Sequence, residues 1–570
     1  MLDQVTKKRI SQSVYLCGFF VTILINPWGN YDPINPIKVT ALAIFSFFSA
    51  GLVLSQFSKL KNFLPFNFLL YILFFILWLF VSFIASGAPK TQQFWGMFGR
   101  NTGVLTYLSL TFLILASAMI QDLKNYVVIL RVFLMVSFFE TVYAFIQIGK
   151  QDPLNWSIFD IFGTLGNANF LSAFLGMSSL VTASLILVKK NQIANRIFLI
   201  IFLLMQLFVL RTTSSIQGMM LFAGGLVILG FVYIYYQSRL KILRLPYLVI
   251  STVILVFTSM ALFNSGPLKK FIYQETIIYR TDYWHAGWKM TILKPIFGVG
   301  IDSYGDWYRT VRGSISATRT DPNRTANTAH NIYLDISSGG GMPLLVFYLA
   351  ILFIALIMSI KYLKNQIKYD AIFVAYFSAW IGFQIQSLIS INQVGVGVWG
   401  WIFTGVLVGY TRGVGLIGKK NSEVDSKNYQ EKNAKKIKSS KQQMLKPGVF
   451  LTAFSLLLVG LALSVPPLLA DSKFRSASNM RDLNKMIAAS KMTGATAWHI
   501  TQVIEAASKS NYLPQAIELD QNLISRFPRD FYGWRVAASD IGLPEKIHLG
   551  AIKKVLELDP DNPDLDIFKK

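Results

Sequence analysis

Long apolar segments separated by short polar connections occupy most of this chain. A helix needs about 20 predominantly apolar residues to cross a bilayer, and the pattern repeats at about that length. Thirteen candidate spans lie at roughly 12–28, 38–57, 66–86, 102–120, 125–148, 167–188, 194–211, 213–236, 246–264, 342–361, 369–390, 396–416 and 448–470. We therefore predict an all-α fold, a polytopic membrane helix bundle of about 13 spans.

Lysine and arginine residues mark alternate connections between these spans. The first apolar run follows Lys7, Lys8 and Arg9 and has no small-residue cleavage site, so we expect a retained span rather than a signal peptide. Because cytoplasmic loops are rich in Lys and Arg, these residues place the N-terminus in the cytoplasm. Every second connection after it is also basic, near residues 59–61, 124, 189–196, 239–244, 361–368 and 419–446. The alternation supports the span count, because one missed span would invert every later connection.

The same pattern divides the chain into four parts. Residues 1–418 form a transmembrane bundle with a large extracytoplasmic loop at 265–342, and residues 419–447 form a basic cytoplasmic linker. Residues 448–470 form a last transmembrane helix, and residues 471–570 form a small extracytoplasmic helical domain. In the last part, the run from Ala551 to Pro563 is similar to the helix end and turn of a tetratricopeptide repeat. About two weak units occur near the usual period of about 34 residues. A helical hairpin domain unrelated to that superfamily is the alternative.

Composition agrees with a membrane protein. Charged residues make up 15% of the chain, against about 25% in soluble proteins. Basic cytoplasmic loops explain the net charge of +25 better than a nucleic-acid partner does, so no nucleic acid is expected. The single cysteine, Cys17, excludes a disulfide framework or a thiolate metal site within one chain. The four histidines lack metal-ligand spacing and no Walker motif occurs, so we expect no cofactor, metal or ATP.

The polar, basic stretch from Asn264 to Pro343 interrupts the apolar pattern. A loop of this length between spans is uncommon unless it has a function. Residues 281–293 have helical periodicity, and one face of that helix would carry Arg280, Trp284, Gly287, Trp288 and Thr291. Tryptophan favours the membrane interface, and a guanidinium binds two phosphate oxygens at once. The alternative is an interfacial amphipathic helix with a solvated arginine.

The same loop contains His330. Thr328 is a plausible N-cap for a helix that starts near His330. A helix N-terminus disfavours imidazolium, so we expect a neutral imidazole, which can accept a proton as a general base. The alternative is a structural histidine that bonds a loop.

Two further charged residues lie in or beside the spans. Arg211 ends the seventh span at the expected outer surface, where it either contributes to a site or extends its charge into water. Glu140 lies in the outer half of the fifth span. A carboxylate inside a membrane is a functional candidate by default, although it may simply pair with an arginine.

Several motifs together resemble the O-antigen ligase and polymerase family of integral-membrane glycosyltransferases, which includes bacterial O-linked oligosaccharyltransferases. In the large loop they are Arg280-Thr-Asp-Tyr-Trp-His-Ala-Gly-Trp288, Lys294-Pro-Ile-Phe-Gly-Val-Gly300 and Ala329-His330-Asn331-Ile-Tyr-Leu334. Earlier, Phe98–Gly103 and Gly163–Asn169 look like the family's outer-loop signatures. The resemblance covers about 90–418.

The resemblance implies transfer of a glycan from a polyprenyl-diphosphate carrier to a lipid, glycan or protein acceptor, with inversion and without a metal, at the outer face of a bacterial cytoplasmic membrane. It implies that Arg211 and Arg280 hold the diphosphate and that His330 activates the acceptor hydroxyl. Together with Glu140, the substrate-binding candidates are Arg100, Asn167, Asn169, Trp284 and Asn331. Family members often carry a Glu nine residues after this histidine. Gly339 stands there in this chain, so that role does not carry over.

The sequence leaves the acceptor open. Ligase and polymerase use the same donor, and the tetratricopeptide-like tail favours a protein acceptor or partner. A transporter or flippase of lipid-linked saccharides is the rival class. It would place charged groups in the middle of several spans and show internal repeats, whereas the candidate residues here collect at one face. A membrane-anchored binding protein with an active tail would leave the loop motifs unexplained.

Overall fold

The protein is all-helical, as the hydrophobic pattern predicts. The computed structural model describes residues 4–155, 161–188, 192–273, 275–319, 321–420, 444–510, 512–539 and 545–569. Within these ranges no β-strand occurs. The predicted linker at 419–447 falls almost entirely outside the described residues.

Ten helices in the described ranges are long and apolar enough to cross a membrane. They are α2 (Asn35–Leu54), α4 (Phe66–Ala85), α7 (Leu123–Ile148), α8 (Ala168–Ile186), α9 (Ile193–Thr212), α10 (Ile216–Tyr236), α11 (Arg244–Leu262), α16 (Ile332–Asn365), α18 (Val394–Lys420) and α20 (Pro447–Asn479). The other predicted spans also coincide with helices, α1 (Gln4–Ile23), α6 (Val104–Ala118) and α17 (Ala371–Ser387). The chain is therefore a multi-pass membrane protein.

Small residues let the spans pack closely. A Cβ added at Gly51 of α2 would lie 2.5 Å from Cα of Ala453 on α20. A Cβ at Gly218 of α10 would overlap the carbonyl of Ser172 on α8. Backbones that approach this closely gain van der Waals contact that lipid tails do not provide, which stabilises the bundle.

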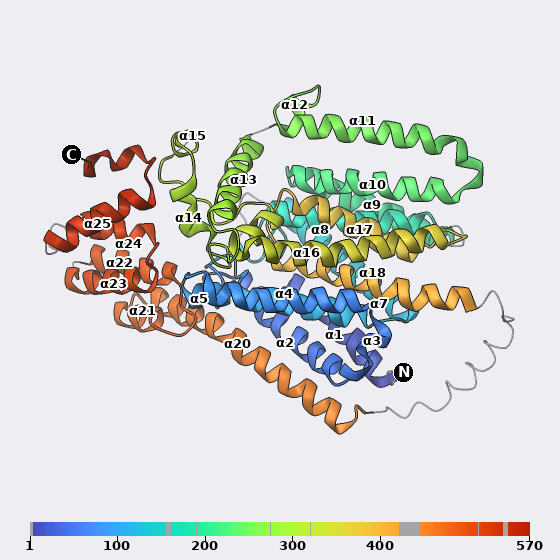
Figure 1. Cartoon of the computed structure of the whole chain (residues 1–570), viewed down its shortest axis with the longest axis horizontal. Helices are drawn as coiled ribbons and strands as arrows, with labels where there is room; N and C mark the ends of the chain where they lie inside the picture. Colours follow the sequence, from blue (N-terminus) through green and yellow to red (C-terminus); the bar gives the residue numbers. More distant parts are fainter. Residues whose placement is uncertain are drawn as a thin grey trace.

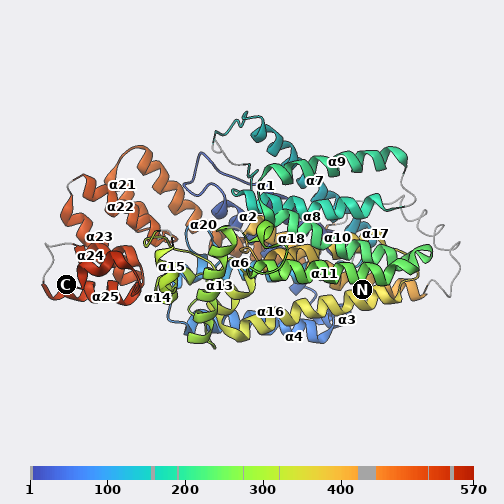
Figure 2. The same ribbon diagram turned by 90° about the horizontal axis from the view of Figure 1, so that it is seen from above.

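The remaining helices gather mainly at one end of the bundle. Those of the long loop between α11 and α16 are α12 (Lys269–Ile272), α13 (Glu275–Leu293), α14 (Tyr304–Val311) and α15 (Ser314–Thr318). Those of the C-terminal part are α21 (Leu483–Ser490), α22 (Ala497–Lys509), α23 (Leu513–Arg526), α24 (Phe531–Ser539), α25 (Glu545–Leu558) and η3 (Pro563–Phe568). Short connecting elements are η1 (Phe57–Lys59), α3 (Leu60–Phe63), α5 (Lys90–Trp95) and η2 (Ser238–Leu243). The N-terminus and the C-terminal helices lie at opposite ends of the bundle (Figure 1), and the second view agrees (Figure 2).

The long loop is shorter and more ordered than the sequence predicts. Helix α13 begins at Glu275 rather than 281, and the helix expected near His330 begins at Ile332 and continues into the span expected from 342. The early start of α16 comes from Asn331, which caps it. The helix then bends at Gly341, whose φ is 81°, just before Pro343. The apolar pattern follows only the part of α16 beyond this bend.

Candidate functional site

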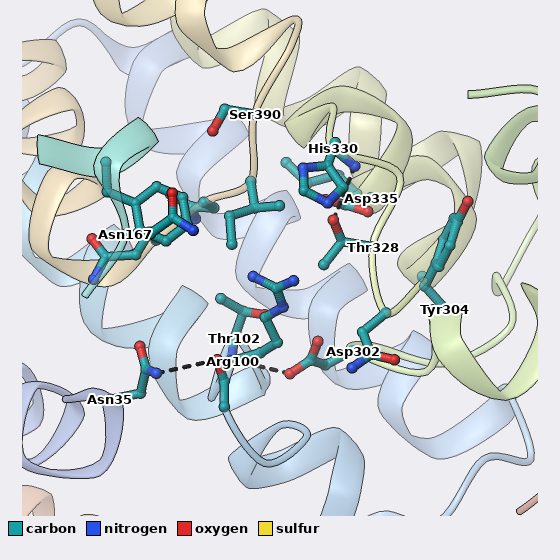
Figure 3. A pocket seen from close by; sticks show the side chains of 18 of the residues that line it. Asn35, Arg100, Thr102, Asn167, Asp302, Tyr304, Thr328, His330, Asp335 and Ser390 are labelled. Atoms are coloured by element: carbon teal, nitrogen blue, oxygen red, sulfur yellow. Dashed lines mark hydrogen bonds between the residues drawn. The ribbon is translucent and has the colours of Figure 1, made fainter. Parts of the chain in front are cut away.

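A cavity of about 360 Å³ opens at the end of the bundle that carries the long loop. Its wall combines loops before α6, α8, α14 and α18 with the start of α16 (Figure 3). Its polar lining consists mainly of Asn35, Arg100, Thr102, Asn167, Asn169, Gln217, Asp302, Thr328, His330, Asp335, Ser390, Asn392 and Gln393. Four predicted site residues line it, namely Arg100, Asn167, Asn169 and His330.

The backbone around His330 is fixed by its neighbours. The Thr328 hydroxyl oxygen accepts a hydrogen bond from the His330 N–H at 2.9 Å, and His330 has a φ of 50°. The Asn331 side chain accepts from the N–H groups of Tyr333 and Leu334, at 3.0 and 3.1 Å. The prediction that Thr328 caps this helix is therefore wrong. Thr328 closes a turn one step earlier, and Asn331 supplies the extended cap residue.

The His330 imidazole is held neutral. Its ring stacks on Tyr283, with centroids 5.4 Å apart and planes at 29°. Burial, followed by the positive charges of Arg100 and Arg280, lowers the pKa of His330 to about 3. The ring is thus unprotonated near neutral pH, but the cause is burial near two arginines rather than a position in the first turn, because His330 precedes the cap residue Asn331.

Helix α13 brings Arg280 to this region by packing along the start of α16. Thr291 and Ser337 share a hydroxyl hydrogen bond of 2.9 Å, and the Trp284 indole N–H points to the His330 carbonyl at 3.5 Å. Arg280 is 7% exposed, and this burial lowers its pKa. Trp288 is 51% exposed and leaves the predicted face. Because an α-helix has 3.6 residues per turn, residues four apart differ by about 40° around the helix axis. Trp288 therefore points further outward than Trp284.

Arg100 points its guanidinium into the centre of the cavity (Figure 3). The Asp302 carboxylate fixes the loop around it by accepting from the N–H groups of Met97 and Thr102, at 2.8 and 3.1 Å. Asn35 donates to the Gly99 carbonyl at 3.1 Å. Burial lowers the pKa of Arg100, and the nearby Asp302 charge opposes that shift. Within the described ranges, neither Arg100 nor Arg280 forms an ion pair.

Arg211 lies outside the cavity wall. It occupies the last turn of α9 with an exposed side chain. The next turn is tied to the cavity, because the Ser215 hydroxyl donates to the Asn169 side chain at 2.8 Å. Asn169 in turn donates its N–H to Asn167, which caps α8, at 2.8 Å. The structure thus connects the segment that carries Arg211 to the site but leaves the Arg211 side chain exposed.

Glu140 does not line the cavity but supports its wall. It is 1% exposed and accepts hydrogen bonds from the Thr164 N–H at 3.0 Å and from the Thr164 hydroxyl. A Cβ at Gly163 would overlap its carboxylate. Its hydrogen-bond partner is Thr164 rather than an arginine, so Glu140 holds the 163–167 loop that lines the cavity.

Sequence reasoning missed three residues of the site. Asp302 anchors the Arg100 loop, and burial raises its pKa. Asp335 accepts the Ala329 N–H at 2.7 Å and lies close to His330 in Figure 3. Tyr304 donates its hydroxyl to the Tyr283 carbonyl at 2.6 Å, which braces the ring that stacks on His330. Asp335 could be predicted from the sequence, because an acidic residue is favoured in the first turn of a helix.

The glycines that follow the histidine have a packing role. The N–H groups of Val299 and Gly300 donate to the carbonyls of Ser338 and Gly339, at 2.7 and 3.0 Å. A Cβ at Gly341 would overlap the Ile296 carbonyl. The 295–300 segment thus crosses directly over the α16 backbone, which leaves no room for a side chain at Gly341.

In the described ranges, no group of three His, Cys, Asp or Glu side chains is arranged to hold a metal ion. Residues 199–349 match the family model described as O-antigen ligase. The match covers α9 to the first half of α16 and includes Arg211, Arg280 and His330. No curated protein sequence matches the chain at a significant level.

Proposed function

Because residues 199–349 place this chain in the O-antigen ligase/polymerase family, we propose that it transfers a glycan from a polyprenyl-diphosphate carrier to an acceptor hydroxyl. Its general class is a membrane glycosyltransferase of this family. One observation carries the finer proposal. The neutral His330 lines the same cavity as Arg100, and the positive charge of Arg280 lowers the pKa of His330.

The reaction needs one bond to form and one to break. The acceptor oxygen attacks the anomeric carbon and passes its proton to a ring nitrogen of His330. The bond from the anomeric carbon to the diphosphate oxygen breaks, and its electron pair leaves with the diphosphate. A single displacement of this kind inverts the configuration at the anomeric carbon.

The arginines serve the leaving group. Arg100 and Arg280 form no ion pair in the described ranges, so their guanidinium groups are free to bind phosphate oxygens. Their charges also lower the pKa of His330 while no donor is bound. The negative diphosphate would offset those charges and raise the basicity of His330 at the moment when a base is required.

The remaining predicted residues have supporting roles in this proposal. Arg211 meets the carrier diphosphate at the membrane surface, since its side chain is exposed at the end of α9. Asn167 and Asn169 bind glycan hydroxyls within the cavity. Asn331 and Trp284 position His330 through the helix cap and the carbonyl contact.

We place the cavity at the outer face of the cytoplasmic membrane. Basic connections favour a cytoplasmic N-terminus. The C-terminal helices and the long loop lie at the end opposite that terminus (Figure 1). Cytoplasmic nucleotide energy is absent there, so an activated lipid-linked donor provides the driving force.

The test uses the full chain in lipid nanodiscs with an undecaprenyl-diphosphate glycan and candidate acceptors. We expect a glycosylated acceptor, free undecaprenyl diphosphate and an inverted anomeric linkage by NMR, with the same yield in EDTA. Movement of labelled donor across a vesicle membrane without a new glycosidic bond would contradict the proposal and favour a transporter.

A further inference from the structure

A second cavity of about 360 Å³ lies between the long loop and the C-terminal helices. One wall comes from α14 and the segment that follows it, with Asp306 and Asn323. The other wall comes from α24 and the residues before it, with Arg529, Tyr532 and Arg535. Figure 2 places these elements beyond the end of the membrane bundle.

The two cavities adjoin at Asn327, which lines both. The next residue, Thr328, lines the first cavity and bonds the His330 backbone. A Cβ at Gly305, in the wall of the second cavity, would lie 2.9 Å from the Asn327 side-chain oxygen. The second cavity therefore lies beside the wall of the first, three residues along the chain from His330.

The second cavity has an excess of positive charge. Arg529 lies over the Trp307 ring at 3.6 Å and donates to the Thr310 hydroxyl at 2.6 Å. Arg535 donates to the Asn323 side chain. Neither arginine forms an ion pair with a carboxylate in the described ranges. Burial raises the pKa of Asp306 to about 7, so this carboxyl is about half ionised at neutral pH, and burial also raises the pKa of Asp530, the other carboxyl in the lining.

We propose that the second cavity binds an acidic segment of the acceptor saccharide, whose carboxylates pair with Arg529 and Arg535. This inference rests on the proposed function and specifies its acceptor. A guanidinium matches the two oxygens of a carboxylate, and the Phe531 and Tyr532 rings in the wall offer flat surfaces for sugar rings. The position beyond the bundle fits a polar saccharide better than a lipid tail.

The direct test measures binding to the full chain in nanodiscs by calorimetry. The probes are a tetramer of galacturonic acid and the neutral maltotetraose. We expect the acidic tetramer to bind at least tenfold more tightly. Arg535→Gln and Arg529→Gln should each weaken its binding about tenfold to a hundredfold, the range for a lost charge-assisted hydrogen bond. Arg535→Lys should keep part of the affinity, and Arg526→Gln, which removes a charge outside both cavities, should keep all of it.

A second readout separates this inference from the proposed function. Release of undecaprenyl diphosphate in the presence of a short neutral acceptor should be unchanged in Arg535→Gln, because the first cavity is intact. Equal affinity for both tetramers, equal affinity in parent and variants, or binding of phosphatidylglycerol vesicles alone would overturn the acidic-saccharide site. If the unmutated chain releases no undecaprenyl diphosphate, the proposed function is wrong. The binding result would then stand on its own.

Discussion

At the scale of single residues, His330 owes its state to contacts from several segments. Thr328 and Asn331 fix its backbone, and Tyr283 orients its ring. Its positive φ of 50° is uncommon for a residue with a side chain. This strained position is the kind that persists where the surrounding contacts determine it and where function uses it.

The neutral state of His330 predicts a specific pH dependence of stability. Its pKa is about 3 in the folded chain and about 6.5 when unfolded, so the unfolded state binds more protons below pH 6.5. The stabilisation is complete above pH 6.5 and is lost as the pH falls toward 3, by about 1.4 kcal/mol per pH unit. Unfolding in urea at pH 7.5 and 5.5, followed by tryptophan fluorescence, should show a smaller pH response for His330→Gln than for the parent. The exposed His285 provides the control variant, and a response in His330→Gln as large as the parent's would contradict the prediction.

At the scale of elements, the contact between the 295–300 segment and α16 sets the cavity wall. Gly300 and Gly339 are joined by a backbone hydrogen bond of 3.0 Å, and both line the cavity. Rigid backbone contacts of this kind position side chains more accurately than a free loop does.

Alanine substitutions at two glycines distinguish the cost of backbone strain from the cost of steric overlap. Gly341 and Gly87 have nearly the same φ, 81° and 80°, but only a Cβ at Gly341 meets other atoms. An alanine at either position costs about 1–2 kcal/mol in backbone strain. Gly341→Ala should therefore lower the apparent Tm much more than Gly87→Ala, measured as the fraction that stays monodisperse after heating. Equal losses would show that the crossing over α16 is not tight.

The sequence predicted the elements better than it predicted their contacts. Ten of the predicted spans coincide with helices in the described ranges that are long and apolar enough to cross a membrane, and helical spacing placed Trp284 on the face of α13 that meets α16. The cap at Asn331 and the cavity position of Asp302 were missed, because both depend on backbone geometry that residue types alone leave open. The exposed position of Arg211 depends on how α9 packs at its end, which periodicity does not report.

At the scale of the whole molecule, the C-terminal helices brace the end of the bundle that holds the candidate site. Asp559 is fully buried and pairs with Arg309 at 2.9 Å and with Arg312 at 2.8 Å, both from the long loop. The turn that contains it, Asp559-Pro-Asp-Asn-Pro563, resembled a repeat boundary in the sequence. In the structure it docks the tail onto α14.

Asp559→Asn should release this docking. Removing one partner of a buried ion pair leaves uncompensated charge and costs about 3–5 kcal/mol. We expect faster proteolysis between α20 and α25 in nanodisc samples. The control is Glu557→Gln, which breaks an exposed pair with Lys554 and should cost at most about 1 kcal/mol. The same cleavage rate in both variants would contradict the docking role.

A second contact couples the tail to Arg100. Trp498 stacks on Phe98, with centroids 4.0 Å apart and planes at 1°, and Phe98 lines the cavity two residues before Arg100. Such a pair contributes about 0.5–1.5 kcal/mol beyond burial. Trp498→Ala should raise the KM for the lipid-linked donor several-fold, while Trp288→Ala, at an exposed indole, should leave it unchanged. An unchanged KM in Trp498→Ala would show that the contact between the tail and Phe98 does not affect donor binding.

The central claim is that His330 takes the acceptor proton during glycan transfer. Single-turnover formation of product, with donor preloaded on the full chain in nanodiscs, measures this step alone. His330→Ala should slow it by about 10²–10⁴, the usual contribution of a general base, and His285→Ala should match the parent. Product formation in a folded His330→Ala variant at the parent rate would contradict the account.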